Sequence, residues 1–251
     1  MGIVNNALIG ASGNQGYNLQ RSLRFRSSAS AYLNRTFGTP TNNIKWTWSG
    51  WVKRGAVTTA DYKVLFSAGS GDGTICALFF NTDNTLYTLN YNGGYNWQLV
   101  TTQKFPDTTS WYHIVMAVDT TLAATRDRIK LYVNGTQITS FSTGTFPSQN
   151  YASPFINQTA YTQFIGRWGT WNGSHNYDGY LSEVNFIDGQ QLTPSSFGQT
   201  DPATGVWVPK KYTGTYGTNG FYLPFTDTSS TTNLVKDSSG NANNWTPNNI
   251  S

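Results

Sequence analysis

The feature that most constrains the fold of this chain is a succession of short apolar or alternating runs without helical periodicity. Turn-forming Gly, Asn, Thr and Ser residues separate them. Such runs are typical of strands, and many short strands joined by turns favour a β-sandwich or jelly roll. Only Thr193–Phe197 suggests a short helical turn, with Pro194 at its first position. We therefore predict an all-β fold with strands at 23–26, 44–52, 63–68, 76–80, 86–91, 111–119, 129–133, 137–141, 164–167, 180–187 and 221–225.

One turn can be assigned from two residues. Asn134 and Gly135 separate the runs 129–133 and 137–141. Asn-Gly accepts the positive φ angles that a two-residue hairpin turn requires. We therefore expect a hairpin at this point.

The tryptophans of the expected strands indicate where the core lies. Residues two apart on a strand share a face, so Trp46 and Trp48 lie on one side of the run 44–52. We expect Trp48 and Trp111 to line the core between two sheets. A large buried ring removes much apolar area from water, which matters in a chain with 15% aromatic residues.

The chain has few residues for acid–base chemistry. Its 12 acidic residues include a single glutamate, Glu183, and it has two histidines. Neither His113 nor His175 stands in the sequence context of a nucleophile elbow. The one cysteine, Cys76, lies in an apolar run, where we expect it to fill the core, and it cannot form an intrachain disulfide. These observations favour a binding or structural module over an enzyme.

Positive charge is concentrated near the N-terminus. Residues 1–60 carry seven basic residues and no acidic one, whereas the other nine basic and 12 acidic residues give the remainder a net charge of −3. Residues 1–20 are rich in Gly and Asn and have little core signal, so we expect a docking arm followed by a basic segment. The candidate docking residues are Ile3, Val4, Leu8, Ile9, Arg21, Arg24 and Arg26. The basic residues are too dispersed to favour nucleic acid as a partner.

Targeting signals give little guidance. The start of the chain lacks the basic and apolar regions of a signal peptide. No apolar stretch of 18 residues is present, so we expect no membrane span.

Four motifs, in order, resemble laminin-G-like domains. They are Trp46-Thr47-Trp48-Ser49-Gly50-Trp51, Trp111-Tyr112-His113-Ile114-Val115, Leu131-Tyr132-Val133-Asn134-Gly135, and Phe164-Ile165-Gly166 followed by Gly179-Tyr180-Leu181-Ser182-Glu183-Val184. The resemblance implies the concanavalin A-like jelly roll of two antiparallel sheets. We expect an arm at 1–20, the jelly roll at 21–200, and a C-terminal extension at 201–251 with a last strand near 221–225 and a polar tail.

A narrower resemblance extends over most of the chain. Segments such as Gly205-Val206-Trp207-Val208-Pro209 and Lys236-Asp237-Ser238-Ser239-Gly240-Asn241 are similar to laminin-G-like proteins of marine bacteriophages. This resemblance implies a virion protein that is made in the host cytoplasm and displayed on the particle surface.

Two loops could bind glycans, because they combine aromatic rings with amides and acids. The candidates are Trp168, Trp171, Asn172, His175, Tyr177 and Asp178 in one loop, and Tyr95 and Trp97 in the other. The competing interpretation is that these rings cover the rim of the sandwich or an oligomer interface, where Trp and Tyr are enriched. If a glycan is bound, we expect Trp168 and Trp171 to be exposed.

No cofactor or metal is expected. Asp72 and Asp178 are candidate calcium ligands, but no regular loop spacing supports a calcium site. The jelly-roll glucanases that this fold resembles use a pair of glutamates, and Glu183 has no second glutamate to pair with.

The sequence therefore predicts a non-enzymatic bacteriophage structural protein, either a decoration or an appendage of the head or tail. Its expected partners are other virion proteins and further copies of itself in a homo-oligomer. A host-glycan adhesin is the alternative, and a glycan hydrolase is the third interpretation.

Overall fold

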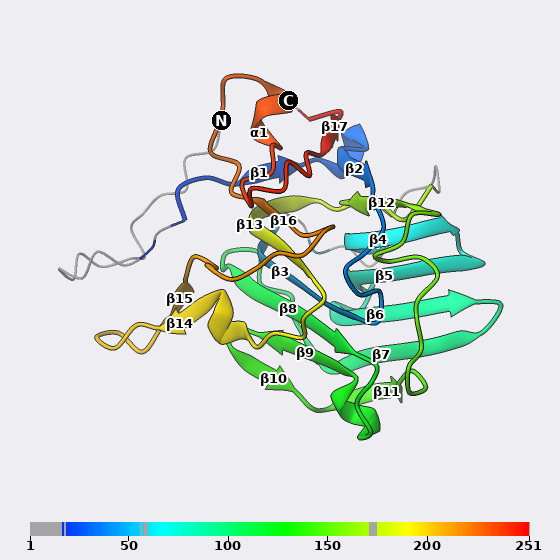
Figure 1. Cartoon of the computed structure of the whole chain (residues 1–251). Helices are drawn as coiled ribbons and strands as arrows, with labels where there is room; N and C mark the ends of the chain where they lie inside the picture. Colours follow the sequence, from blue (N-terminus) through cyan, green and yellow to red (C-terminus); the bar gives the residue numbers. More distant parts are fainter. Residues whose placement is uncertain (1–16, 18, 56, 58–59, 171–174, 251) are drawn as a thin grey trace.

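The computed structural model describes residues 17, 19–55, 57, 60–170 and 175–250, which form two large antiparallel sheets and one small sheet (Figure 1). The predicted all-β architecture is confirmed. Sheet A has the order β1-β13-β3-β8-β9-β10, with β16 also paired to β13. Its strands are β1 (Leu23–Phe25), β3 (Lys45–Arg54), β8 (Tyr112–Asp119), β9 (Ile129–Val133), β10 (Thr136–Ile138), β13 (Gly179–Asp188) and β16 (Phe221–Leu223).

Sheet B packs against sheet A and has the order β11-β7-β6-β5-β4-β12-β2-β17. Its strands are β2 (Tyr32–Thr36), β4 (Lys63–Gly71), β5 (Thr74–Phe80), β6 (Thr85–Asn92), β7 (Tyr95–Lys104), β11 (Phe141–Thr145), β12 (Thr162–Ile165) and β17 (Thr246–Asn248). The remaining elements are the small sheet of β14 (Gly198–Thr200) and β15 (Trp207–Pro209), the helix α1 (Thr231–Leu234), and short 3-10 turns at Ser27–Ala29, Thr125–Asp127 and Pro194–Ser196.

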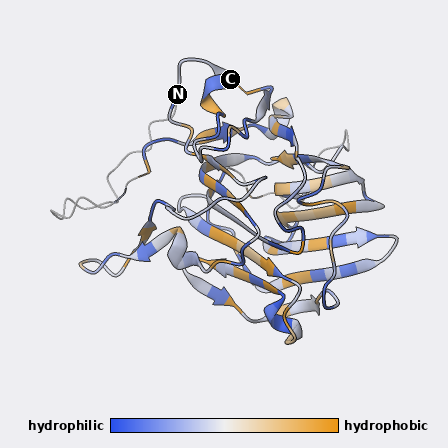
Figure 2. Ribbon diagram, viewed as in Figure 1, coloured by the Kyte–Doolittle hydropathy of each residue, from blue (hydrophilic) through white to orange (hydrophobic). Residues whose placement is uncertain are grey.

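The main core lies between the two sheets. The even-numbered residues Trp46 and Trp48 of β3 point into it, as their spacing predicts, and Trp48 stacks on Phe66 of β4 with ring centroids 6.5 Å apart. Cys76 is fully buried there, as expected. Figure 2 shows apolar residues concentrated on the strands.

Trp111 corrects the sequence prediction. It immediately precedes β8 and is only half-buried, so it does not line the core. The motif strand starts one residue later than expected, and the core side chains of β8 are Ile114, Met116 and Val118.

The outer face of sheet A is covered by the chain that follows β13. Val115, Ala117, Tyr132 and Ile187 of the sheet are buried beneath Phe197. This layer explains why the strands of sheet A are buried on both faces.

His113 is part of this outer layer. Its ring is fully buried between Trp51 and Trp207, with centroid distances of 5.0 and 6.0 Å. Trp207 Nε1 donates to His113 Nδ1 at 3.0 Å, and Ser49 Oγ lies 2.9 Å from His113 Nε2. His113 therefore has a packing role in this layer.

Strand β13 changes partners along one edge. Residues 179–181 pair with β1, and residues 184–186 pair with β16, so the two short strands lie end to end. The register of β13 against β3 shifts between Ser182 and Asn185, and Glu183 has a φ of +50° at this bulge. A bulge of this kind bends a strand and redirects its side chains.

The C-terminal segment belongs to the same core, which corrects the expectation of a polar tail. Val235 and Trp245 are buried in the main core, and β17 pairs with β2 at the edge of sheet B. The composition is polar because the segment makes many loop hydrogen bonds around Asp237 and Asn243.

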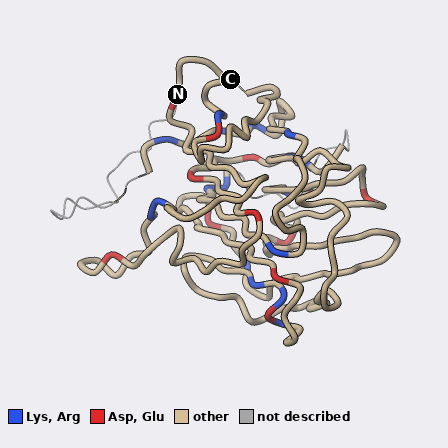
Figure 3. Tube along the Cα trace, in the orientation of Figure 1, with Lys and Arg blue, Asp and Glu red and all other residues tan. Residues whose placement is uncertain are grey.

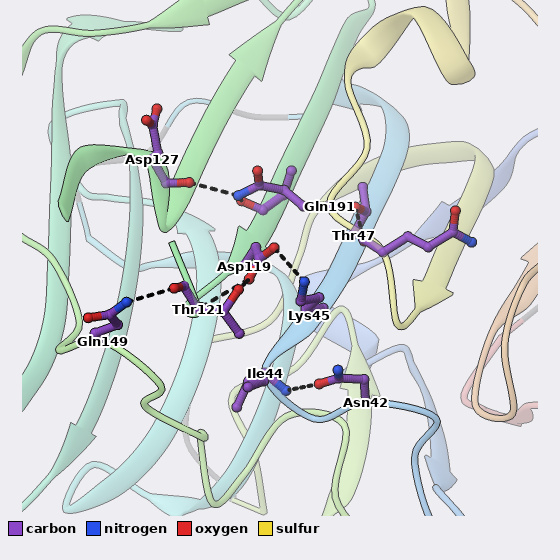
Figure 4. A network of polar contacts seen from close by, with 11 residues as sticks. Asn42, Ile44, Lys45, Thr47, Asp119, Thr121, Asp127, Gln149 and Gln191 are labelled. Carbon is purple, nitrogen blue, oxygen red and sulfur yellow. Dashed lines mark hydrogen bonds and ion pairs between the residues drawn. The ribbon is translucent and has the colours of Figure 1, made fainter. Parts of the chain in front are cut away.

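Polar contacts close one end of the sandwich (Figure 4). Lys45 Nζ lies 3.0 Å from Asp119 Oδ2, and the backbone N–H of Thr121 donates to Asp119 Oδ1 at 3.0 Å. Gln149 Nε2 donates to the carbonyl oxygen of Thr121 at 2.9 Å. These bonds tie the start of β3 and the loop before β12 to the end of β8.

The basic segment is only partly exposed, because the predicted docking residues Arg21 and Arg26 lie on the surface whereas other arginines are paired or buried. Arg24 pairs with Asp178 at 2.9 Å, Arg54 is buried, and Arg35 bonds to Asn243. In the view of Figure 3, basic and acidic residues are interspersed over the described chain. The other predicted docking residues of the arm, Ile3, Val4, Leu8 and Ile9, lie outside the described residues.

Candidate functional site

A strip of aromatic rings crosses the outer face of sheet B. Side chains alternate along β5, so Phe79 points outward while Phe80 points into the core. Tyr62, just before β4, contacts Phe79 with ring centroids 4.9 Å apart, and Phe79 contacts Tyr87 of β6 at 4.6 Å. The sheet thus holds three rings from neighbouring strands in one row.

The loop after β12 adds two further rings. Trp168 meets Phe79 edge-on at 5.2 Å, and His175 lies 4.7 Å from Tyr62 between ring centroids. The loop is fixed at Gly169, whose N–H donates to Ser67 Oγ at 2.9 Å. Gly169 has a φ of +49°, and a Cβ there would lie 2.7 Å from the carbonyl oxygen of Gly69, so a larger residue would lift the loop from the sheet.

Polar groups surround the rings. His175 Nδ1 pairs with Asp61, whose other carboxylate oxygen lies 3.8 Å from Lys63 Nζ. Gln98 Nε2 donates to the hydroxyl of Tyr87. Burial raises the pKa of Tyr87 well above its ordinary value, so its hydroxyl remains protonated.

The strip is partly accessible to solvent. Tyr62 and Gln98 are half-buried, and the side chain of His175 is 23% exposed. Tyr95, at the start of β7, is 50% exposed and contacts Tyr91 with centroids 4.9 Å apart. We call Tyr62, Phe79, Tyr87, Tyr91, Tyr95, Trp168 and His175 the aromatic face.

Three predicted glycan residues, Trp168, His175 and Tyr95, lie on this face. Trp168 is only 4% exposed, so the expectation that it is exposed was wrong. Its indole Nε1–H is buried and has no hydrogen-bond partner among the described residues. Trp171 and Asn172 lie outside the described residues.

The other predicted glycan residues are placed elsewhere. Trp97 and Tyr177 are 1% and 0% exposed and point into the core, which corrects their assignment as ligand contacts. Tyr177 donates from its hydroxyl to the carbonyl oxygen of Lys53 at 2.8 Å. Asp178, a candidate glycan ligand, forms an ion pair with Arg24, a candidate docking residue. The two side chains therefore bind each other.

Sequence reasoning missed Asp61, Tyr62, Tyr87 and Gln98, whereas Tyr91 begins the second candidate loop, which extends to Trp97. The alternation in β6 contained the signal, because Tyr87 and Tyr91 are four residues apart and therefore share a face of that strand. Asp61 and Tyr62 gave no such signal, since they come together with His175 only through tertiary contacts across 113–114 residues of chain.

Metal-binding clusters and membrane-spanning helices are both absent from the described part of the chain. It contains no group of three or more His, Cys, Asp or Glu side chains placed to hold a metal ion, and Asp72 is exposed at the turn between β4 and β5. No helix in that part is long and apolar enough to cross a membrane.

These features define a class of protein: a two-sheet antiparallel sandwich that carries aromatic and polar side chains on an outer face. Residues 26–196 match the Laminin_G_3 family, described as the concanavalin A-like lectin/glucanases superfamily, and the chain belongs to this family. The predicted laminin-G-like fold is thereby confirmed.

Solved structures of similar shape are distant in sequence. The heptameric SAP-like pentraxin of Limulus polyphemus is 16% identical, with a TM-score of 0.48 over 68% of this chain and 76% of that one. Domain 4 of a Geobacillus stearothermophilus GH43 arabinanase, in complex with arabinotriose, is 19% identical, with a TM-score of 0.41 over 72% of each chain. The LG4-5 domains of the mouse laminin α1 chain are 11% identical, with a TM-score of 0.43 over 72% of this chain and 45% of that one. No curated protein sequence matches the chain.

Proposed function

We propose that the protein is a non-enzymatic carbohydrate-binding module whose ligand lies on the aromatic face of sheet B. The observation that carries the proposal is the grouping of Tyr62, Tyr95 and His175 with the polar side chains Asp61 and Gln98 on one outer face. Binding sites for small molecules combine apolar and aromatic surface with a few polar groups that fix orientation.

The chemistry of the face suits sugars. Ring faces offer apolar surface to the CH groups of a pyranose, while the Asp61–His175 pair, Gln98 and the tyrosine hydroxyls can bond its hydroxyl groups.

The placement of the acidic residues supports binding of a carbohydrate without its hydrolysis. Asp61 is already engaged by His175 and by Lys63. Glu183 lies on sheet A, so it cannot act as a second carboxyl group beside Asp61.

The test is a glycan array on the intact protein, followed by calorimetry with any glycan that binds. Replacing the exposed Tyr95 with alanine should weaken binding about tenfold, which corresponds to about 1.4 kcal/mol. Tyr180→Ala is the matched control, because Tyr180 is a half-buried tyrosine on sheet A, and it should leave the affinity unchanged.

Two results would contradict the proposal. One is an array without any bound glycan. The other is equal weakening by Tyr95→Ala and Tyr180→Ala, which would indicate a general loss of stability or a site elsewhere.

We further propose that the module acts on the surface of a bacteriophage particle, as a decoration or appendage protein in a homo-oligomer. The sequence resemblance to phage laminin-G-like proteins is the support for this assignment. Locating the chain in images of intact particles would test it, and an absence from purified particles would contradict it. Loss of host adsorption in particles that carry Tyr95→Ala would favour the adhesin role over a purely structural one.

A further inference from the structure

A second polar site lies on sheet A, away from the aromatic face. At its centre is Glu183, the only glutamate of the chain, which is 7% exposed. Its φ of +50° is uncommon for a residue other than glycine. The bulge that imposes this angle lies where β13 changes its partner from β1 to β16.

Two tyrosine hydroxyls meet the carboxyl group. The hydroxyl of Tyr17, which precedes β1, and that of Tyr222 in β16 each lie 2.6 Å from Glu183 Oε2. The two hydroxyl oxygens are 2.5 Å from each other. The three oxygen atoms therefore form a closed triangle with a hydrogen-bond distance on every side.

Counting protons determines the state of the carboxyl group. Each side of the triangle needs one hydrogen, because two oxygens at this distance repel each other without one. The phenols of Tyr17 and Tyr222 supply two hydrogens, and an ionised carboxylate supplies none. If Glu183 is protonated, each oxygen donates once and accepts once, and all three contacts are satisfied.

We propose that Glu183 and Tyr222 form a socket for the phenol of Tyr17, that the socket holds the neutral carboxylic acid, and that it anchors the described residues before β1 to sheet A. Ionisation of Glu183 removes one hydrogen from the triangle and loosens Tyr17. The site binds a phenol, and in this structure the phenol comes from the same chain.

The surroundings of Glu183 agree with a neutral acid. Burial raises the pKa of its carboxyl group above the ordinary value, against the opposing effects of the two tyrosine hydrogen bonds and of the charge on Lys211. The titratable and charged groups that face it are Tyr17, Tyr222 and Lys211, with Tyr216 close by. Burial also raises the pKa of Tyr17 and of Tyr222 well above their usual range, so both hydroxyls keep their protons while Glu183 titrates.

The socket is independent of the proposed carbohydrate site, because the two lie on different sheets. Its contribution to stability has a defined sign. A carboxyl group with a raised pKa stabilises the folded state below its unfolded-state pKa, and this stabilisation is lost as the pH rises through the folded-state pKa.

The single glutamate makes a direct test feasible. Glutamate labelled with carbon-13 at Cδ gives one side-chain carboxyl resonance in the intact protein, and its titration reports Glu183 alone. We expect a midpoint above the ordinary value of 4.5. A midpoint at or below 4.5 would overturn the proposal.

The anchoring function is read out by hydrogen exchange of the backbone amides in residues 17–25, with correction for intrinsic exchange rates. In the wild type, protection should fall about tenfold across the same pH transition. Glu183→Gln places a neutral amide in the socket and should keep protection at high pH. Tyr17→Phe should lower protection about three- to tenfold already at low pH.

Tyr216→Phe is the matched control, because its hydroxyl bonds to Asn185 Oδ1 at 3.1 Å and not to Glu183. It should leave both the carbon-13 midpoint and the exchange transition unchanged. Protection that does not change with pH in the wild type would refute the proposal, as would a Tyr17→Phe protein with wild-type protection. Protection that increases with protein concentration would also refute it, since Tyr17 would then come from another copy.

Discussion

At the scale of single residues, His113 shows how burial and hydrogen bonding fix a protonation state. Trp207 Nε1–H donates to Nδ1, so Nδ1 carries a lone pair and the proton sits on Nε2, from which it can be donated to Ser49. Burial lowers the pKa of His113 to about 3. The ring is therefore neutral in the folded protein over the whole physiological range.

The first prediction concerns stability against pH. The unfolded chain takes up a proton on His113 near its ordinary pKa of 6.5, whereas the folded chain does not. The stabilisation is thus complete above pH 6.5 and is lost as the pH falls toward 3. Relative to a His113→Gln variant, the wild type should lose about 2 kcal/mol of unfolding free energy between pH 7 and pH 5.

Urea unfolding of both proteins across this range measures the effect. Parallel stability curves would show that His113 titrates normally and that its contacts with Trp207 are not formed in solution.

At the scale of elements, the turn after β9 matches its prediction in detail. Asn134 and Gly135 both have positive φ angles, +48° and +81°. The turn also packs against Trp207, since a Cβ on Gly135 would lie 2.7 Å from the ring of Trp207. The sequence could not indicate this tertiary contact.

The second prediction separates these two effects. Gly93, in the turn after β6, has a φ of +71°, and a Cβ added to it would meet no other atom within 4 Å. Gly93→Ala should therefore cost only the conformational penalty, about 1 kcal/mol. Gly135→Ala should cost about 2–3 kcal/mol, because the new methyl group also displaces Trp207.

Chemical denaturation of the two variants compares the costs directly. Equal losses of unfolding free energy in the two variants would mean that Trp207 of the β14–β15 hairpin does not pack against the turn.

The strands that sequence predicted share a physical property, which is an apolar run that ends at a turn. β3, β5, β6, β8, β9 and β13 have buried side chains on nearly every residue and were found within a few residues. β2 and β17 were missed because they are short or polar, and their pairing is fixed by the partner strand rather than by their own composition. β14 and β15 were missed as well, and so was the ten-residue β7, although its residues alternate in burial as a strand's do.

At the scale of the whole molecule, the C-terminal 50 residues complete the sandwich. Phe221, Phe225 and Trp245 are buried in the main core. Phe221 contacts Trp245 at 4.9 Å and stacks on Phe186 at 5.8 Å between ring centroids. The expected extension is thus structurally part of the jelly roll.

The third prediction follows from this packing. A chain that ends at Thr200 should show no cooperative thermal transition, because it exposes the rings beneath Phe221 and Trp245. In the full-length chain, Trp245→Ala should cost about 3–5 kcal/mol. Calorimetry measures both, and a truncated chain that melts cooperatively would contradict the prediction.

The candidate site illustrates the limit of sequence reasoning at this scale. The loop containing Trp168 and His175 was identified from composition alone. Its partners Asp61, Phe79 and Tyr87 belong to three other segments, and only the order of β4, β5 and β6 in sheet B brings them next to that loop. Strand order depends on long-range pairing, which a single sequence does not reveal.

The placement of β1 and β17 has a mechanical consequence. Each is three residues long and pairs at the margin of its sheet. Asn249 donates a hydrogen bond to the carbonyl oxygen of Ser30 at 3.3 Å, so the segment between β1 and β2 lies beside the last described residues. A tensile load applied through the two ends of the described chain would therefore act on the few hydrogen bonds of these short marginal strands before it reached the long strands. The ten-residue strands β3 and β13 would bear the load only after β1 and β17 had detached from their sheets. Under tension the sandwich would therefore unfold stepwise from its edges, and its central strands would separate last.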